Sequence, residues 1–461
     1  MSENAKYLEG NLLRHISVMA LSSTVGLMAV FLVDFVDMIF ISMLGKAELA
    51  AAIGYAGAIL FFTGSFGIGM AIACGALVAR ALGRGDQAAA RRAATSSMLI
   101  GVAFGALFSA LVWFNIDPLV RLLGASGETA ALAGSYLSLI LPSLPVLLVG
   151  MVGGGILRAH GDARRSMMVL IWGGLVNAIL DPILIFGLDL DLTGAALASV
   201  AARFTIAATA LVSVIRHHGG FDRPTVGQVA QDLRPNLAIA VPAILTQLAT
   251  PSGQAYVTRA MADYGEAAVA GMAIVARLTP VAFAVIFALS GAIGPVIGQN
   301  FGAGNKDRVR GSIRDGLIFA ALVIVFVSAL LYLLRPVLET TFQLDGVARD
   351  LVFLFAGPLS LLFFFNGAIF VANAAFNNLG HPFYSTMLNW GRHTLGTIPF
   401  VIAFSIWFGA AGVLIGQAVG GVIFGIAAIF WAYRVAERGG GDQTKPFAGN
   451  STLLRLFHLR R

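Results

Sequence analysis

The stretch Asn177–Pro182, which reads Asn-Ala-Ile-Leu-Asp-Pro, interrupts an apolar run over residues 167–188. Asn177 and Asp181 are four residues apart, so a helix places them on one face. Pro182 has no amide hydrogen and leaves the carbonyl four residues earlier without its helical partner. Because an isolated carboxylate is costly in hydrocarbon, the combination of amide, carboxyl and free carbonyl indicates a cation or proton site.

The composition of the whole chain places this stretch in a membrane protein. Of 461 residues, 58% are hydrophobic and 11% are charged, whereas soluble domains are about 25% charged. Apolar runs of about twenty residues recur along the chain, as in transmembrane helices. We therefore expect an all-α polytopic membrane protein. The net charge of +7 fits basic cytoplasmic loops and does not indicate nucleic-acid binding.

Twelve transmembrane helices account for the apolar runs. Their expected spans are 15–43, 49–79, 93–116, 129–157, 166–188, 192–215, 236–262, 267–298, 316–334, 351–378, 383–407 and 409–433. With both termini placed in the cytoplasm, the inside segments hold 22 of the 30 Lys and Arg residues, and the outside loops hold four. This asymmetry predicts that both termini are cytoplasmic.

The two halves of the chain repeat each other. Leu82–Asp86 corresponds to Phe301–Asn305, and Leu157–Asp162 to Phe376–His381, each at an offset of 219 residues. Six spans per half give parallel repeats, so we expect two six-helix bundles related by an axis along the membrane normal. The predicted domains are an N-terminal lobe (1–215), a cytoplasmic linker (216–235), a C-terminal lobe (236–433) and a basic cytoplasmic tail (434–461).

Three acidic residues fall inside the expected spans, and all belong to the first half: Asp34, Asp37 and Asp181. Asp37, Asp181 and Ser199, on three different spans, each lie roughly 10 Å below the outer surface at 1.5 Å per residue. Intramembrane ionisable groups are functional by default. Asp37, Asn177, Asp181 and Ser199 are therefore the predicted cation-coupling residues, and Pro182 is the predicted helix kink.

Arg203 follows Ser199 by four residues and shares its helix face. A guanidinium remains charged in proteins, so Arg203 and Asp34 are predicted to belong to the network around the site. We hypothesise that Arg203 pairs with a carboxylate such as Asp34, leaving Asp37 and Asp181 to share a proton or a Na⁺. A purely structural role for Arg203 remains open.

These motifs resemble those of multidrug and toxic compound extrusion (MATE) transporters. The similar segments are Phe35–Phe40, the Gly-x-Gly loops at 83–85 and 302–304, the motif of Asn177–Pro182, and Gly194–Ser199. The resemblance implies a V-shaped pair of six-helix bundles and efflux driven by inward Na⁺ or H⁺ movement. It also implies a cation site in the N-terminal lobe, at the four coupling residues, which would be metal ligands only if Na⁺ is the ion.

The chain departs from one branch of that family. NorM-like members carry carboxylates in spans 7 and 10, whereas span 7 offers Gln247 and Gln254 and span 10 offers Asn366 and Asn373. The sequence therefore resembles the DinF-like branch. A fixed positive charge at Arg203 should weaken Na⁺ binding, which favours H⁺ as the coupling ion.

The predicted function is an antiporter that exports amphipathic, cationic organic compounds. We expect a monomer in the plasma (inner) membrane of a bacterial-type cell, in contact with membrane lipid and small-molecule substrates, without cofactor or nucleic acid. One alternative is a flippase of lipid-linked precursors in the same superfamily. Such flippases resemble this chain in having cationic residues within the spans, which are here Arg203, Arg277 and Arg392. The sequence does not contain the loop signature of major-facilitator transporters, which argues against that class. The spans also contain no metal-binding cluster or Ser/His pair of the kind that an enzyme would need.

Overall fold

The structure is a computed structural model that describes residues 5–44 and 47–439. The secondary structure of these residues is helical, without strands. The helices of the first half are α1 (Leu12–Met43), α2 (Ala47–Gly83), α3 (Gln87–Trp113), α4 (Ile116–Leu122), α5 (Gly127–Ile140), α6 (Leu144–Ala159), α7 (Ala163–Pro182) and α8 (Asp191–His217). A 3₁₀ turn (Leu141–Ser143) joins α5 to α6.

The second half contains ten helices and one π-helical turn, Phe355–Leu359. The helices are α9 (Val226–Ala262), α10 (Glu266–Ala282), α11 (Ala284–Gly302), α12 (Lys306–Leu333), α13 (Arg335–Phe342), α14 (Gly346–Leu354), α15 (Ser360–Leu362), α16 (Phe364–Asn378), α17 (Phe383–His393) and α18 (Ile398–Arg438). The part of the predicted tail from residue 440 onward lies outside the described residues.

These helices supply the twelve predicted crossings. In the described part of the chain, nine helical segments are long and apolar enough to span a membrane, and ten if the bent pair Gly346–Leu362 and Phe364–Asn378 is one span. The segment Phe383–Arg438 has 56 residues, which is enough for two crossings. Its backbone breaks at Gly409, where φ is 56°. The 37-residue helix α9 provides the remaining crossing.

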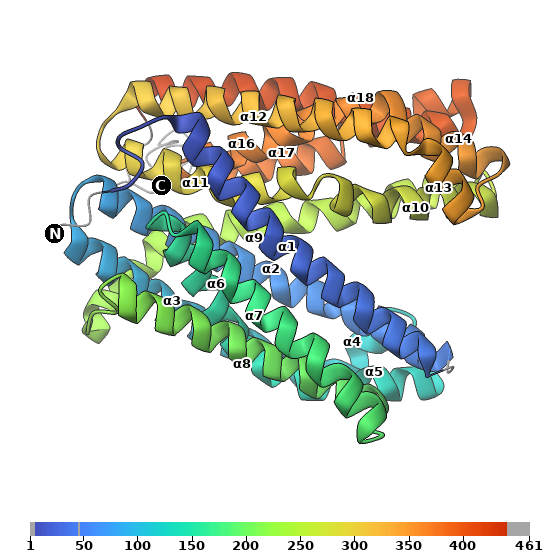
Figure 1. Cartoon of the computed structure of the whole chain (residues 1–461), viewed down its shortest axis with the longest axis horizontal. Coiled ribbons are helices and arrows are strands. Elements are labelled where there is room, and N and C mark those ends of the chain that lie inside the picture. The colour runs from blue at the N-terminus through green and yellow to red at the C-terminus, as the bar shows by residue number, and fades with distance from the viewer. Residues whose placement is uncertain (1–4, 45–46, 440–461) are drawn as a thin grey trace, which may run out of the picture.

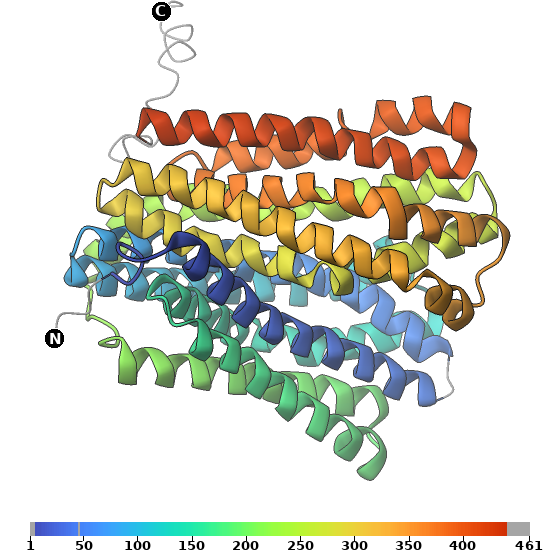
Figure 2. The same ribbon diagram turned by 45° about the horizontal axis from the view of Figure 1, so that its top comes forward.

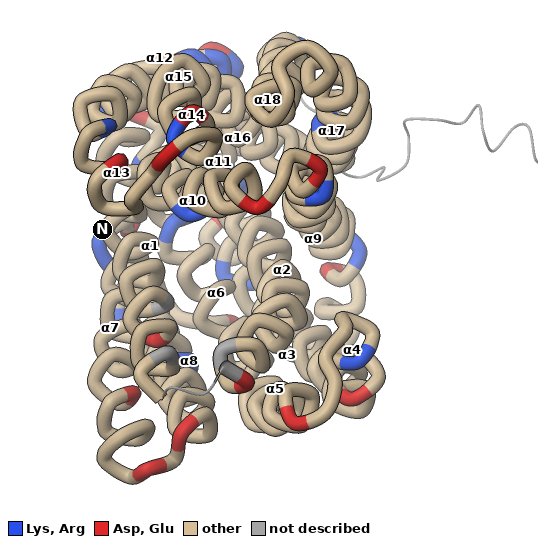
Figure 3. Tube along the Cα trace, turned by 90° about the vertical axis from the view of Figure 1, so that its right-hand side faces the viewer, with Lys and Arg blue, Asp and Glu red and all other residues tan. Residues whose placement is uncertain are grey.

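The helices form two bundles, α1–α8 and α9–α18, which lie close together at the end that carries both termini and diverge toward the other end (Figures 1 and 2). Figure 3 looks at the diverging end, where charged residues mark the connecting turns. The described hydrogen bonds between the halves all lie at the end with the termini, such as Ser97 Oγ to Asn236 Oδ1 at 2.6 Å. The ion pair between Arg92 and Asp232 (2.9 Å) is also there.

The repeat at 219 residues reappears in the backbone. Gly85 and Gly304 both have positive φ angles, 76° and 74°, and so do Gly161 and Gly380, 78° and 87°. Glycine adopts this left-handed region without the steric cost of a Cβ atom, and it commonly ends helices. The turns that end corresponding helices are therefore built alike in the two halves.

The same repeat organises the contact between the bundles. A Cβ atom on Gly83 would collide with the carbonyl of Gln299, and one on Gly302 would collide with the carbonyl of Arg80. Gly83 corresponds to Gly302 in the repeat, and Arg80 corresponds to Gln299. The two contacts are therefore equivalent, and the interface is close to two-fold symmetric. Arg80 donates to the carbonyl of Asn377 at 2.5 Å, and Gln299 donates to that of Ala159 at 2.8 Å. Two glycines thus permit backbone contact between the lobes.

Helix α1 belongs to both bundles. Its first turns, including Ile16 and Met19, are fully buried in a core with α11 and α12 of the second half. Its later part packs against α7 and exposes large apolar side chains, including Leu32 (63% exposed) and Phe35 (56% exposed). The end of α1 near the N-terminus is therefore fixed, whereas the part that carries Asp37 has fewer packing constraints.

Helix α7 is anchored at its start by Asp162. The carboxylate caps the helix by accepting from Arg165 N at 3.1 Å, and it also binds the Arg165 guanidinium at 2.6 Å and His218 Nε2 at 3.0 Å. Burial disfavours the charged form, but the hydrogen bonds from His218 and Arg165 outweigh this and hold the pKa of Asp162 well below its usual range.

We therefore expect Asp162→Ala to destabilise the protein by about 1 kcal/mol from the lost helix cap alone. Because the folded-state pKa is depressed, the contribution of the ionised carboxylate is complete above a pH of about 4 and is lost as the pH falls through the folded pKa. Thermal unfolding of the detergent-solubilised protein measures the difference. Equal melting temperatures of wild type and variant at pH 7 would contradict this role.

Candidate functional site

The polar stretch that interrupts the fifth span lies at the centre of the site, on α7. This helix is packed between α1 and α8 (Figure 1). Asn177 and Asp181 are both buried, with exposed fractions of 7% and 0%. Asn177 Nδ2 donates to Asp181 Oδ2 at 2.6 Å, so the two side chains share a face, as their spacing predicts. The amide thereby orients the carboxyl group.

Pro182 ends α7, and a π-helical turn, Ile183–Gly187, follows it. The missing amide of a proline prevents a regular α-helical bond to the preceding turn, and wider turns of this kind occur often at functional sites. Pro182 therefore lies where the helix geometry changes, directly after the buried carboxylate.

Asp37 of α1 faces Asp181, and the two carboxyl groups interact directly. In the described part of the chain, Asp37 Oδ1 and Asp181 Oδ1 are buried atoms without a hydrogen-bond partner. Buried acceptors without a partner are costly, so each oxygen requires a proton or a cation. The side chain of Asp34, one turn earlier on α1, lies outside the described residues.

Ser199 of α8 joins this group through Tyr136 of α5. The Tyr136 hydroxyl interacts with Ser199 and lies close to Asp37, Asp181 and Arg203. The structure thus brings the four predicted coupling residues into one region, on three helices. Tyr136 was missed by the sequence analysis, although it is the only tyrosine between residues 127 and 159.

Arg203 contacts the break in the fourth span. Its guanidinium donates to the carbonyl of Ile140 and to Ser143 Oγ, both at 2.9 Å. Both acceptors belong to the turn between α5 and α6, where the helical bonding is irregular. These bonds favour the structural role that the sequence left open. The hypothesised pair with Asp34 involves a side chain outside the described residues.

Removing the hydroxyl of Tyr136 tests whether this residue contributes to the site. We expect Tyr136→Phe to lower the transport rate by about tenfold, because one hydrogen bond to a charged network contributes roughly 1.5–3 kcal/mol. The measurement is initial efflux rate in vesicles at matched protein levels. Tyr332→Phe, at an exposed tyrosine on α12, is the matched control, and equal rates for the two variants would exclude a role for the Tyr136 hydroxyl.

The second half has no equivalent site among its described residues. The repeat counterpart of Asp37 is near Val257, which is fully buried in an apolar core. The described residues contain no cluster of three or more His, Cys, Asp or Glu side chains that could bind a metal. The site is instead a carboxylate pair with an amide and hydroxyls, which is suited to one proton or one monovalent cation.

Comparison with known proteins supports the family resemblance. The MatE family model matches the chain twice, over residues 23–183 and 242–402. The chain belongs to the MatE family. Residue 23 corresponds to 242 and 183 to 402, so the two matches repeat the offset of 219 and confirm the parallel repeat of the MATE fold.

Relatives of similar length have transport functions. The chain is 28% identical to a FAD transporter of Shewanella oneidensis, over 91% of this chain and 94% of that protein. It is 25% identical to the multidrug export protein MepA of Staphylococcus aureus, over 91% and 93%. A crystal structure of a Vibrio cholerae MATE transporter (a VcmN mutant) superposes with a TM-score of 0.88 at 24% identity, over 93% and 98%. The predicted fold and the predicted efflux transporter are thus confirmed at the level of the family, whose members are transporters rather than enzymes.

Proposed function

We propose that this transporter is a secondary-active antiporter in which inward movement of H⁺ or Na⁺ through the Asp37–Asp181 pair drives export of an organic compound. The observation that supports this most is the pair itself: two carboxyl groups on separate helices, each with a buried oxygen that no described residue satisfies. A bound cation or proton would give both oxygens an interaction partner. Its release would leave two negative carboxylates that repel each other.

The position of Asp37 supports a simple coupling mechanism. Its helix, α1, is buried against the second lobe at its start but is largely exposed near Asp37. When the carboxylates are neutralised, α1 can pack more closely against α7; when they are charged, it separates. Because the start of α1 contacts the other lobe, this change biases the lobes between two arrangements, as alternating access requires.

The orientation follows from the distribution of basic residues, with both termini in the cytoplasm of a bacterial-type cell and the protein in the plasma membrane. The lobes then touch on the cytoplasmic side and diverge outward. H⁺ is the favoured coupling ion, because two neighbouring carboxylates share a proton readily and Arg203 adds a positive charge near the site. We further propose that the protein acts as a monomer in the lipid bilayer.

The proposed substrate is a small amphipathic organic compound. The acidic residues of the sequence favour a cation, and the similarity to a multidrug export protein favours an organic compound. The similarity to a FAD transporter extends the candidates to an anion. Asp37 and Asp181 lie together in the first lobe. Because we assign them to ion coupling, the charge of the substrate depends on other residues.

Proteoliposomes with a trapped pH-sensitive dye test the proposal. Ethidium, an amphipathic cation, and flavin mononucleotide (FMN), an amphipathic anion, serve as the two substrates. We expect one of them to drive proton movement in the opposite direction without Na⁺. Transport that requires Na⁺ and persists after the pH gradient is collapsed would replace H⁺ by Na⁺, and transport insensitive to both gradients would exclude antiport.

A further inference from the structure

A row of polar pairs joins α16 to α17 inside the second lobe. Asn377 Oδ1 accepts from Ser385 Oγ at 3.4 Å. About one turn further along both helices, Asn373 Oδ1 accepts from Asn389 Nδ2 at 3.1 Å. These residues are at most 8% exposed. The helices run in opposite directions, so the next pair along the row should involve residues before Asn373 and after Asn389.

Beyond Asn373 and Asn389 the polar groups lack partners. The spacing of the row places Ile369 opposite His393, and Asn366 lies about one turn further along α16. Asn366 shares a face of α16 with Asn373, seven residues away, and Arg392 shares a face of α17 with Asn389. Asn366 Oδ1 and both ring nitrogens of His393 are buried without a hydrogen-bond partner in the described chain, and His393 is only 4% exposed. The row is thus complete at one end and unsatisfied at the other.

Arg392 is unusual among the arginines surrounded by protein. Arg80, Arg203 and Arg335 each donate to a main-chain carbonyl. Arg392 is partly buried near the end of α17, and its guanidinium has no hydrogen bond or ion pair with any described residue. A charged group in this position is costly unless an opposite charge or acceptor reaches it.

The surrounding helices provide no such charge. Helix α17, which carries Arg392, packs against α9, α16 and α18, and the acids of these four helices are Asp232 at the start of α9 and Glu437 at the end of α18. The described neighbours are neutral: Gly253 of α9 lies against the His393 ring, and Gln417 Nε2 donates to Gln254 Oε1 at 3.3 Å. The positive charge of Arg392 is therefore uncompensated by the protein around it.

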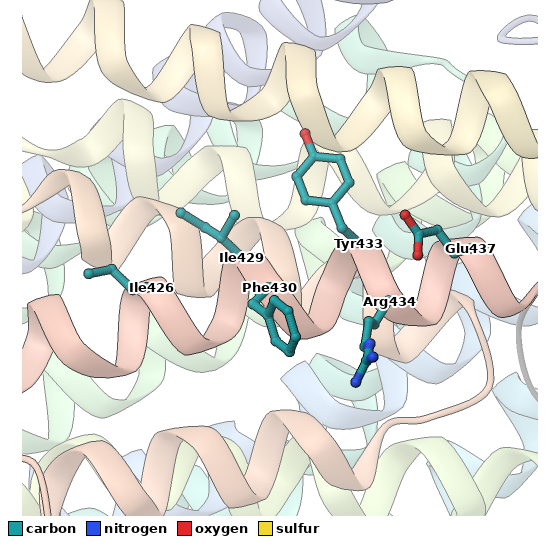
Figure 4. A pocket seen from close by; sticks show the side chains of 6 residues that line it. All are labelled: Ile426, Ile429, Phe430, Tyr433, Arg434 and Glu437. Atoms are coloured by element: carbon teal, nitrogen blue, oxygen red, sulfur yellow. The ribbon is translucent and has the colours of Figure 1, made fainter.

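Aromatic side chains border the same region. Trp390 of α17 donates through its indole nitrogen to the carbonyl of Leu245 at 2.9 Å, and Phe424 of α18 lies against Gly391 and Gly396. A guanidinium with aromatic neighbours can bind the anionic group of a ligand while the rings contact its apolar part. A separate surface hollow of about 440 Å³ on α18 is lined by apolar side chains such as Ile426 and Phe430, both largely exposed, together with Arg434 and Glu437 (Figure 4). Its charged residues include an acid, unlike the surroundings of Arg392.

We propose that Arg392, His393 and Asn366 form an anion-binding subsite that holds the carboxylate or phosphate of an amphipathic organic anion during export. This inference rests on the proposed function and specifies its substrate class, and it replaces the cationic substrate expected from the sequence. The first lobe then binds the coupling cation and the second lobe the substrate anion, so the two charges do not compete for one site.

Binding to the purified, full-length protein in detergent micelles tests the subsite. FMN and riboflavin share their ring and ribityl chain and differ by one phosphate. Pyrenebutyrate and pyrenebutanol differ by a carboxylate in place of a hydroxyl. We expect the anionic member of at least one pair to bind about tenfold or more tightly than its neutral partner, as one charge-assisted interaction provides. The pair that shows this preference identifies phosphate or carboxylate as the recognised group.

Substitutions then locate the preference. Arg392→Gln should remove it while leaving the affinity for riboflavin or pyrenebutanol unchanged, and Arg392→Lys should retain it in part, because lysine keeps the charge without the planar fork. Asn366→Ala should weaken it less. Arg259→Gln, at an exposed arginine of α9 paired with Asp263, is the matched control and should bind as wild type.

The proposal is overturned if, in the wild-type protein, neither anion binds more tightly than its neutral partner. This outcome does not depend on the stability of the variants. The proposal is also overturned if Arg392→Gln weakens the charged and neutral ligands equally. Failure of the subsite is separable from failure of the antiport mechanism. If proton-coupled transport of ethidium persists while neither anion binds more tightly than its neutral partner, only the subsite is wrong. If an anion binds selectively but no gradient drives its movement, only the coupling is wrong.

Discussion

Asp181→Asn is expected to abolish coupled efflux while leaving the protein folded. Asparagine has nearly the same shape as aspartate and can still bond to Asn177, so the packing of α7 against α1 and α8 should persist. It cannot exchange a proton or carry the negative charge that attracts a cation. Because coupling free energies of 1–3 kcal/mol correspond to factors of about 5 to 150, we expect gradient-driven transport to fall by about 100-fold.

The matched substitutions give this experiment its specificity. Asp37→Asn, on the facing helix α1, should have the same effect, because its carboxyl group faces that of Asp181. Asp117→Asn alters an exposed acid on α4 and should transport as wild type. Efflux is measured in everted vesicles, with the amount of folded protein determined by size-exclusion chromatography. Full efflux in both the Asp37 and Asp181 variants would remove these residues from the coupling mechanism.

Much of this site could be predicted from the sequence because it depends on local helix geometry. A spacing of four residues places Asn177 beside Asp181 in any α-helix, and the observed 2.6 Å bond follows from it. The depth of Asp37 and Asp181 along their spans required only the rise per residue. The repeat at 219 residues likewise depends on sequence offsets, and it predicted the two lobes.

The remaining contacts depend on helix rotation and on irregular turns, which sequence patterns do not determine. Tyr136 reaches the site only because α5 presents that face to α8, and an apolar span gives no indication of this. Arg203 donates to the carbonyl of Ile140 and to the hydroxyl of Ser143 at the turn Leu141–Ser143, so its partners arise from a break in another helix rather than from a complementary charge. The unpaired position at Arg392 becomes evident only when α16 and α17 are aligned.

Gly83→Val is expected to separate the lobes at the end that carries the termini. Gly83 lies against the Gln299 carbonyl, and Gly302 lies against that of Arg80. The contacting atoms are backbone, so they cannot move aside as a flexible side chain would. Overpacking of this kind costs about 1–3 kcal/mol, which shifts a two-state equilibrium by a factor of about 5 to 150. The penalty falls only on the arrangement in which the lobes touch here, so the opposite arrangement should become more populated.

Distances between spin labels at the lobe ends measure this shift. Cys74 is fully buried and should be replaced by alanine so that labels attach only at introduced cysteines. We expect Gly83→Val to lengthen the distance between the lobes at the end with the termini and to shorten it at the other end, and Gly302→Val to do the same, because the interface is nearly symmetric. Gly57→Val is the matched control on the same helix, since no atom lies within 4 Å of the added Cβ. A wild-type distance distribution for Gly83→Val would show that the glycine contact does not control the arrangement of the lobes, because the lobes would then have tolerated the added bulk without separating.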